Sequence, residues 1–237
     1  DLVVSPEIQA TGNRSGAAAD LIATLDGVHA ALLGGEDFTE EVIAAAPDLE
    51  VISRIGVGFD RVDLEAARAR GIPVVVAAGS NHVTVADFAF GLVLALARGI
   101  LAGHQAAVAG NWGMNIGTDL RGKTLGVMGL GRIGRTVVEQ AGGFGMRVLG
   151  FEAFPDGQFV ADHGVSLVNL DTLCRESDFL TLHVPLADET RGIIDEDRLA
   201  MMKNTAYLVN TARGELIDED ALFTALKAGQ IAGAGLD

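Results

Sequence analysis

A glycine-rich segment, GLGRIG at residues 129–134, has the G-x-G-x-x-G spacing that can hold the pyrophosphate of a dinucleotide. In such a segment the first glycine, Gly129, permits a sharp turn between a strand and a helix. The second, Gly131, lets a phosphate approach the backbone, and the third, Gly134, lets the helix pack closely on the strand. Because glycines also serve ordinary tight turns, the motif needs support from its surroundings.

The sequence on either side of this motif gives that support. An apolar run, Thr124–Gly129, predicts the strand before it, and residues Arg132–Phe144 predict the helix after it. The first amides of that helix, including those of Arg132 and Ile133, have no partner within the helix and can bind phosphate oxygens. We therefore expect a dinucleotide site here.

Glu152 follows the next predicted strand, eighteen residues beyond Gly134. Its carboxylate can accept hydrogen bonds from the adenosine ribose hydroxyls and would repel a 2′-phosphate, which favours NAD over NADP. A solvated acid at a strand end is the alternative interpretation.

Two segments in the first third of the chain contain groups that suit a small anion. Gly56 and Gly58 surround Val57 just after an apolar strand, so consecutive backbone N–H groups can form a nest for a carboxylate. A plain strand-to-helix turn would use the same residues. Asn81 can donate its amide to an anion, or it can cap the helix that begins at His82.

Two further groups follow predicted strands near the end of the sequence. Arg213 lies in the segment NTARG, beyond the carboxyl end of an apolar strand, where ligands gather in open α/β sheets. A guanidinium there can bind a carboxylate bidentately and polarise an adjacent carbonyl, although surface arginines are common. Asp237 can accept a hydrogen bond from a nicotinamide carboxamide, or it is a solvated acid.

Apolar strands alternate with helical patterns along nearly the whole chain, which indicates parallel sheets covered on both faces. The predicted strands are Leu2–Ser5, His29–Leu33, Val51–Arg54, Val74–Ala77, Thr124–Gly129, Arg147–Phe151, Phe179–His183, Ala206–Asn210 and Ile231–Leu236. The predicted helices include Thr39–Ala46, Asp63–Arg70, His82–Arg98, Arg132–Phe144 and Asp218–Ala228. Gly71 and Gly229 are expected to end two of them as left-handed caps.

The two strand–helix series are separated by a long Ala/Leu/Val-rich helical region from Asn81 to about Gly110. We therefore predict two α/β domains with parallel sheets, Rossmann-like or flavodoxin-like, joined by interdomain helices. The predicted domains are residues 1–78, which bind the substrate, and residues 79–237, which bind the dinucleotide. One continuous doubly wound sheet is the alternative.

The overall composition excludes several classes of protein. Hydrophobic residues make up 49% and charged residues 21% of the 237 residues, as in a globular chain with a sizeable core. The net charge of −15 argues against a nucleic-acid partner, and an anionic substrate would need local positive groups. The most apolar stretch, Phe88–Leu96, is shorter than the ~20 residues of a membrane span. The single Cys174, with no export signal, favours a reducing cytoplasm, and no metal site is predicted.

Taken together, these segments resemble the NAD-dependent D-2-hydroxyacid dehydrogenases, most closely the D-3-phosphoglycerate dehydrogenase branch. The matching text covers most of residues 50–237 in order: VISRIGVGFDRVDLEAARARGIPVV, GLGRIGRTVVEQAGGFGMRVLGFE, LTLHVPL and MMKNTAYLVNTARGELIDEDALFTALKAGQIAGAGLD. The resemblance implies hydride transfer between a D-2-hydroxy acid and nicotinamide, with a role in serine biosynthesis. It also implies a homodimer or higher homo-oligomer, with a surface from the helices of residues 82–110.

The resemblance also implies individual roles. The backbone of Gly56, Val57 and Gly58 and the side chain of Asn81 would hold the substrate carboxylate, and Arg54 a distal phosphate. Arg213 would be catalytic, binding the carboxylate and the carbonyl oxygen. The implied cofactor contacts, besides the three glycines, are Arg132, Ile133, Glu152, His183, Val184, Pro185, Thr211, Ala212, Arg213 and Asp237.

Some features depart from the family pattern. Most relatives have Asp-Pro where this chain has Glu152-Ala153, so NADP stays open as the alternative to NAD. Both ends look truncated, and the expected first strand and helix are missing. The family's catalytic Glu and His would follow Asp237, so residues 1–237 alone are expected to be nearly inactive.

Three other functions remain open at this point. The first is a glyoxylate or hydroxypyruvate reductase of the same family. The second is a non-catalytic NAD-sensing protein, and the third is an enzyme of another family, such as a methyltransferase, that uses the same glycine motif.

Overall fold

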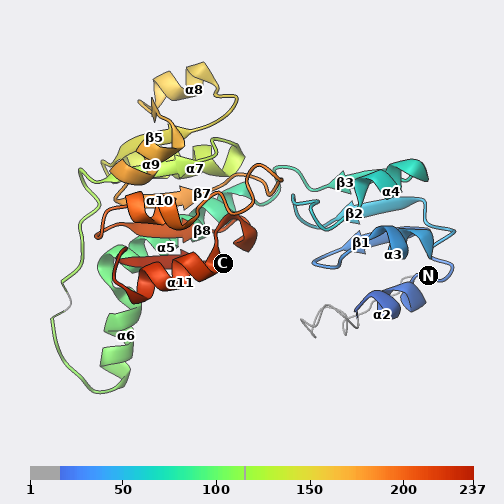
Figure 1. Ribbon diagram of the computed structural model, residues 1–237, viewed down its shortest axis with the longest axis horizontal. Coiled ribbons are helices and arrows are strands. Elements are labelled where there is room, and N and C mark those ends of the chain that lie inside the picture. The colour runs from blue at the N-terminus through green and yellow to red at the C-terminus, as the bar shows by residue number, and fades with distance from the viewer. Residues whose placement is uncertain (1–16, 115) are drawn as a thin grey trace. The chain divides into compact units, whose positions relative to one another are not determined.

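The computed structural model describes residues 17–114 and 116–237 (Figure 1). The chain divides into two compact units, with the boundary between Asn81 and His82. The boundary predicted from the sequence, after residue 78, lies three residues earlier. Each unit contains its own parallel sheet, so the alternative of one continuous sheet is wrong.

The first unit has a three-stranded sheet with the order β1-β2-β3. Its strands are β1 (Ala30–Leu33), β2 (Val51–Arg54) and β3 (Val74–Val76), and its helices are α2 (Ala17–Thr24), α3 (Glu40–Ala44) and α4 (Leu64–Ala69). The side chains of Thr39 and Asp63 cap α3 and α4 by accepting a hydrogen bond from the third residue beyond them. The predicted strand Leu2–Ser5 lies outside the described residues.

The second unit has a six-stranded parallel sheet with the order β6-β5-β4-β7-β8-β9. Its strands are β4 (Thr124–Met128), β5 (Arg147–Phe151), β6 (Ser166–Leu167), β7 (Phe179–Leu182), β8 (Tyr207–Asn210) and β9 (Gly233–Leu236). Its helices are α5 (His82–Arg98), α6 (Ile100–Val108), α7 (Arg132–Gly143), α8 (Gly157–Asp162), α9 (Leu170–Glu176), α10 (Glu196–Met201) and α11 (Glu219–Lys227), with a 3₁₀ turn at Gly214–Leu216. The order of the strands reverses between β4 and β7, where ligands bind in doubly wound sheets.

The central strands of this sheet are buried on both faces, as the continuous apolar runs predict. Successive residues point to opposite sides: Val127 packs in a core with α5 and α7, whereas Met128 packs in a core with α9, α10 and α11. Gly233 and Gly235 leave room on β9, since a Cβ at either position would approach Leu96 of α5. The two cores fix the strands, and therefore the loops that follow them.

The helical region between the two strand series is divided at Gly99, whose φ of 57° is left-handed. The predicted helix His82–Arg98 is confirmed at both ends as α5, and α6 follows it. Among the described residues, no single helix is long and apolar enough to cross a membrane. By length and composition only, α5 and α6 pass that test together, as a pair bent by 63°.

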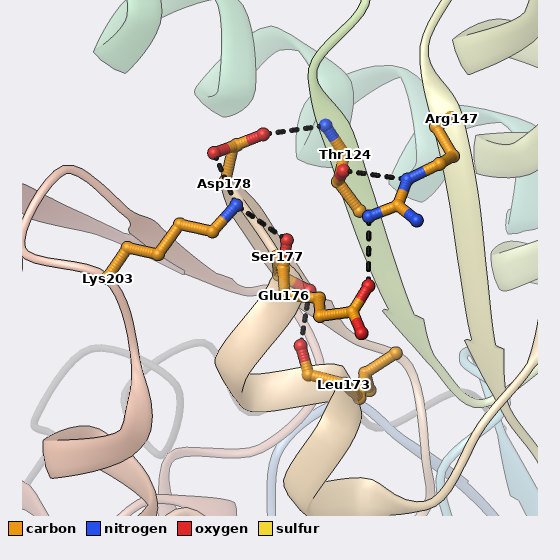
Figure 2. Close-up of polar contacts among 7 residues, drawn as sticks. All are labelled: Thr124, Arg147, Leu173, Glu176, Ser177, Asp178 and Lys203. Atoms are coloured by element: carbon orange, nitrogen blue, oxygen red, sulfur yellow. Dashed lines mark hydrogen bonds and ion pairs between the residues drawn. The ribbon is translucent and has the colours of Figure 1, made fainter.

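At the amino ends of β4, β5 and β7, five polar residues form what we call the amino-edge network (Figure 2). Asp178 accepts the N–H of Thr124 at 2.8 Å and pairs with Lys203 Nζ at 2.8 Å. Arg147 donates to Thr124 Oγ1 at 3.1 Å and pairs with Glu176 at 3.0 Å. Lys203 Nζ also donates to the Glu176 carbonyl at 2.7 Å. The network ties the start of three strands to α9 and to the chain before β8.

Candidate cofactor site

The carboxyl ends of five strands of the second sheet stop in one row. In this row Met128 is paired with both Phe151 and Leu182, Leu182 with Asn210, and Asn210 with Leu236. The next residue after each strand is one of the predicted cofactor residues, namely Glu152, Gly129, His183, Thr211 and Asp237. The fold therefore brings groups from five distant segments to a single edge, which we call the carboxyl edge.

The three glycines of the motif differ in what requires them. Gly129 has a φ of 95°, and a Cβ there would lie 2.8 Å from the carbonyl of His183. A Cβ at Gly134 would collide with the carbonyl oxygen of Gly129, so this glycine permits the contact of helix and strand. Gly131 has an ordinary φ of −69°, and a Cβ there would meet nothing within 4 Å. The protein's own packing does not require glycine at residue 131, whereas space for a phosphate does.

Gly131 is also the N-cap of α7, and it offers no side-chain hydrogen bond to the helix. The amides of Arg132 and Ile133 therefore have no capping partner from that residue, and the positive end of the helix dipole faces the same side. This arrangement fits a pyrophosphate.

Glu152 lies directly against the glycine loop. Its Oε2 accepts the N–H of Leu130 at 2.7 Å, and its Oε1 accepts the N–H of Phe154 at 3.1 Å. Each carboxylate oxygen can accept more than one hydrogen bond, so both can still receive ribose hydroxyls.

His183 is held as a neutral imidazole at the end of β7. Its Nε2 lies 2.9 Å from Oγ1 of Thr181, a fully buried hydroxyl, and its Nδ1 is buried without a hydrogen-bond partner. Burial lowers the pKa of His183 to about 4. Val184 and Pro185 follow it along the same edge, and Val184 packs against the second core.

The turn after β8 is shaped by Asn210, which the sequence analysis did not single out. Its Oδ1 accepts the N–H of Ala212 at 3.0 Å, and its Nδ2 donates to the carbonyl of Arg213 at 2.7 Å. Arg213 is partly buried with extended backbone, and its Nη1 donates to the carbonyl of Ala212 at 2.8 Å. Oγ1 of Thr211 is buried without a partner. Asp237, after β9, is exposed and donates its N–H to the Asn210 carbonyl at 3.0 Å.

In the first unit, Arg54 at the end of β2 is only 6% exposed. Its Nε donates to the carbonyl of Gly58 at 3.0 Å, and its Nη1 is buried without a partner. Val57, between Gly56 and Gly58, is 38% exposed. Within the described ranges no carboxylate pairs with Arg54. A buried guanidinium without a carboxylate partner is suited to bind an anion.

Asn81 is the last residue of the first unit, immediately before α5. Its Oδ1 is buried without a hydrogen-bond partner. Each of the predicted substrate residues therefore belongs to the first unit, and each predicted cofactor residue to the second.

Comparison with known proteins identifies the class. Residues 90–237 match the sequence model of the D-isomer specific 2-hydroxyacid dehydrogenase, NAD binding domain. Because this match covers more than half of the chain, the chain belongs to the D-isomer specific 2-hydroxyacid dehydrogenase family, and its second unit is an NAD-binding domain. The predicted fold class and cofactor are thereby confirmed.

Individual relatives agree with this family. The chain is 45% identical to a glyoxylate reductase of Korarchaeum cryptofilum, over 83% of this chain and 61% of the relative. It is 46% identical to a D-3-phosphoglycerate dehydrogenase of Methanocaldococcus jannaschii, over 86% of this chain and 39% of the relative. The chain thus spans less than two thirds of either relative.

Solved structures are also similar. A D-lactate dehydrogenase from Aquifex aeolicus, complexed with NAD and lactic acid, has a TM-score of 0.86 and 33% identity, covering 91% of this chain and 66% of that one. The TT0316 protein of Thermus thermophilus has the same TM-score and 37% identity, covering 100% of this chain and 72% of that one.

Proposed function

We propose that the protein is an NAD-dependent oxidoreductase that interconverts a D-2-hydroxy acid and the corresponding 2-oxo acid. The observation that carries this proposal is the row of strand ends, which brings the glycine loop, Glu152 and the turn of Arg213 to one edge. When bound, NAD supplies the acceptor or donor of the hydride. The residues of this chain bind and orient the reactants.

The proposed cofactor roles follow from the free groups at the carboxyl edge. The amides of Arg132 and Ile133 bind the pyrophosphate, and the space beside Gly131 admits it. The carboxylate of Glu152 accepts the adenosine ribose hydroxyls and repels a 2′-phosphate. The remaining contacts proposed from the family are His183, Val184, Pro185, Thr211, Ala212 and Asp237.

Arg213 is the proposed catalytic residue. Its guanidinium binds the substrate carboxylate and donates to the oxygen at C2, which stabilises negative charge on that oxygen. Asn210 fixes the turn from which Arg213 extends, so less side-chain freedom is lost on binding. The family assigns the general base to a Glu–His pair that follows the residues of this chain, and we keep that assignment as part of the proposal.

We propose that the substrate is a 3-phosphoglycerate-like acid, because Arg54 is buried with an unpartnered Nη1. The N–H groups of Gly56, Val57 and Gly58, with the amide of Asn81, would hold its carboxylate. Glyoxylate or hydroxypyruvate is the second candidate substrate, since the relatives include a glyoxylate reductase and a hydroxypyruvate reductase. Neither of these candidates contains a phosphate for Arg54 to bind.

A substrate panel on the full-length protein tests these proposals. NADH oxidation is followed with phosphohydroxypyruvate, hydroxypyruvate and glyoxylate, for the wild type and Arg54→Met. We expect phosphohydroxypyruvate to have the highest kcat/KM and to lose it selectively in Arg54→Met. Equal losses on all three substrates would contradict the phosphate role. NADH binding without turnover on any 2-oxo acid would instead favour an NAD-sensing protein.

We also propose a homodimer in a reducing cytoplasm. Ile100, Leu101 and Val108 of α6 are each more than half exposed, which suits an apolar contact between copies. Burial raises the pKa of the Cys174 thiol to about 11, so this cysteine is a packing residue. Light scattering of the full-length protein, with Leu101→Glu as the variant, tests the dimer. A monomeric wild type would refute it.

A further inference from the structure

The backbone of Leu130, between the first two glycines of the motif, is held from both sides. Glu152, at the end of β5, accepts its N–H at 2.7 Å. Arg135, from the first turn of α7, donates from Nε to its carbonyl oxygen at 2.9 Å. The Leu130 side chain is 3% exposed. The peptide groups on both sides of this residue are therefore fixed by side chains that are distant from each other in the sequence.

Arg135 is itself anchored by α8. Its Nη1 pairs with Oδ2 of Asp156 at 3.0 Å, and its Cζ lies 5.1 Å from the centre of the Phe159 ring. Oδ1 of the same Asp156 caps α8 by accepting the N–H groups of Gln158 and Phe159. The guanidinium therefore makes two directed hydrogen bonds in one geometry, one to the glycine loop and one to Asp156.

The hydrogen bonds to Leu130 are relevant to ligand binding because the next residue is Gly131. Gly131 has no Cβ and no neighbour within 4 Å of where a Cβ would be, so its own packing does not hold it in place. If a loop becomes ordered only when the ligand binds, the loss of its conformational entropy lowers the affinity for the ligand. With Leu130 held at both its N–H and its C=O, the loop before the amides of Arg132 and Ile133 is already ordered.

We propose that Arg135 is a positioning residue for the dinucleotide: it holds the glycine loop in the conformation that binds pyrophosphate, with Asp156 as its anchor. The inference rests on the proposed binding of NAD at the carboxyl edge. Arg135 does not itself contact the ligand in this proposal, because its Nε and Nη1 are directed to Leu130 and Asp156.

Binary binding to the full-length protein tests the inference without any turnover. Dissociation constants are measured for NADH and for ADP-ribose, which contains the pyrophosphate but lacks nicotinamide. In Arg135→Met we expect both affinities to fall by the same factor, roughly tenfold, as for loss of a hydrogen bond to a charged group. Amide hydrogen exchange of the free protein should become faster at residues 130–133.

Arg147→Met is the matched control. Arg147 also donates from Nε to an oxygen and pairs with a carboxylate at 3.0 Å, but at the amino edge of the same sheet. We expect a similar fall in melting temperature and unchanged affinity for both ligands. If both variants weakened binding equally, Arg135 would be a merely structural residue, and the inference would fail.

Asp156→Asn guards against a variant that fails to fold, because Asn can still cap α8. It removes the ion pair, so we expect a loss of about threefold, consistent with a partly exposed pair. The double variant should bind as weakly as Arg135→Met, because both changes act through one guanidinium. Wild-type affinity in both single variants would overturn the inference alone, whereas a wild type that bound neither NADH nor ADP-ribose would overturn the proposed function itself.

Discussion

The two edges of the second sheet differ in whether their polar groups have hydrogen-bond partners. At the amino edge, Thr124, Arg147, Glu176, Asp178 and Lys203 satisfy one another through hydrogen bonds and ion pairs (Figure 2). At the carboxyl edge of the same sheet, Nδ1 of His183 and Oγ1 of Thr211 are buried with no partner. A buried polar group without a partner costs about 1–3 kcal/mol of stability.

This difference suggests that one edge of the sheet serves stability and the other serves ligand binding. The amino edge is complete within the protein, so its residues serve stability. The carboxyl edge, where the strand order reverses, contains buried polar atoms without hydrogen-bond partners. It also has open space beside Gly131. We infer that a ligand completes this edge, and the following variants test whether the two edges can be separated by experiment.

The largest effect is expected at Arg213. In Arg213→Lys the charge is kept but the two-pronged donor geometry is lost, so kcat/KM should fall by about 10²–10³, the range for removing one donor to a developing oxyanion. The dissociation constant of NADH should change by less than about threefold, in line with a substrate role. Steady-state kinetics with a fluorescence titration of NADH checks both. A large loss of NADH affinity with kcat unchanged would assign Arg213 to the cofactor instead.

The next effect is expected at Gly131. In Gly131→Val the side chain enters open space, so the free energy of unfolding should change by less than about 1 kcal/mol. NADH affinity should fall about a hundredfold or more, because hydrogen bonds to charged phosphate oxygens are lost. Urea denaturation and an NADH titration of the same sample check the two effects.

Gly134→Ala is the comparison for this variant, because its Cβ would collide with the carbonyl of Gly129. It should lower stability by about 1–3 kcal/mol, as overpacking does. If Gly131→Val destabilised the protein as much as Gly134→Ala, the space beside residue 131 would be needed by the fold and not by a ligand.

The third effect concerns His183 and pH. The unfolded imidazole takes up a proton near pH 6.5, whereas burial lowers the folded pKa to about 4. Stability is therefore lost as the pH falls from 6.5 to about 4, by roughly 3 kcal/mol at about 1.36 kcal/mol per pKa unit. In His183→Gln this part of the pH dependence should disappear from urea denaturation curves. An unchanged slope would mean that His183 titrates normally in the folded protein.

The smallest effect is expected at the amino edge. Burial raises the pKa of Asp178, but hydrogen bonds from Lys203 and from the Thr124 N–H outweigh it and hold the pKa below its usual value. The stability from this group is present above the ordinary carboxyl range and is lost as the pH falls through it. Asp178→Asn should cost about 1–2 kcal/mol at pH 7 and leave NADH affinity unchanged. Weaker NADH binding in this variant would show that the two edges are coupled.

Much of the fold could be predicted from the sequence, because buried parallel strands are short apolar runs that stop at polar or glycine residues. The predicted strands Val51–Arg54 and Arg147–Phe151 are confirmed at both ends, and Gly71 and Gly229 are left-handed as expected. Strand β6 was missed because its two residues are exposed and have no apolar run. The predicted helix His82–Arg98 ends at Arg98 as expected, before the left-handed Gly99.

The candidate site was predictable where residue type and spacing carry it, as in the glycine motif and Glu152. Asn210, Thr181 and Arg135 were missed because each acts on a neighbouring group that only the fold identifies: a turn, an imidazole or a backbone carbonyl. The motif assigned Gly131 to phosphate binding and Gly134 to helix–strand packing. The structure gives the physical reason, because a Cβ would meet nothing at Gly131 and would collide with backbone at Gly134.

The most direct test of the account is amide hydrogen exchange of the full-length protein with and without NADH. We predict slower exchange in NADH at residues 130–134, 152–154, 183–186 and 211–213, and unchanged exchange at the amino edge around residues 123–125 and 176–178. Equal protection at both edges, or protection confined to segments away from the carboxyl edge, would contradict the claim that this edge is the site completed by the cofactor.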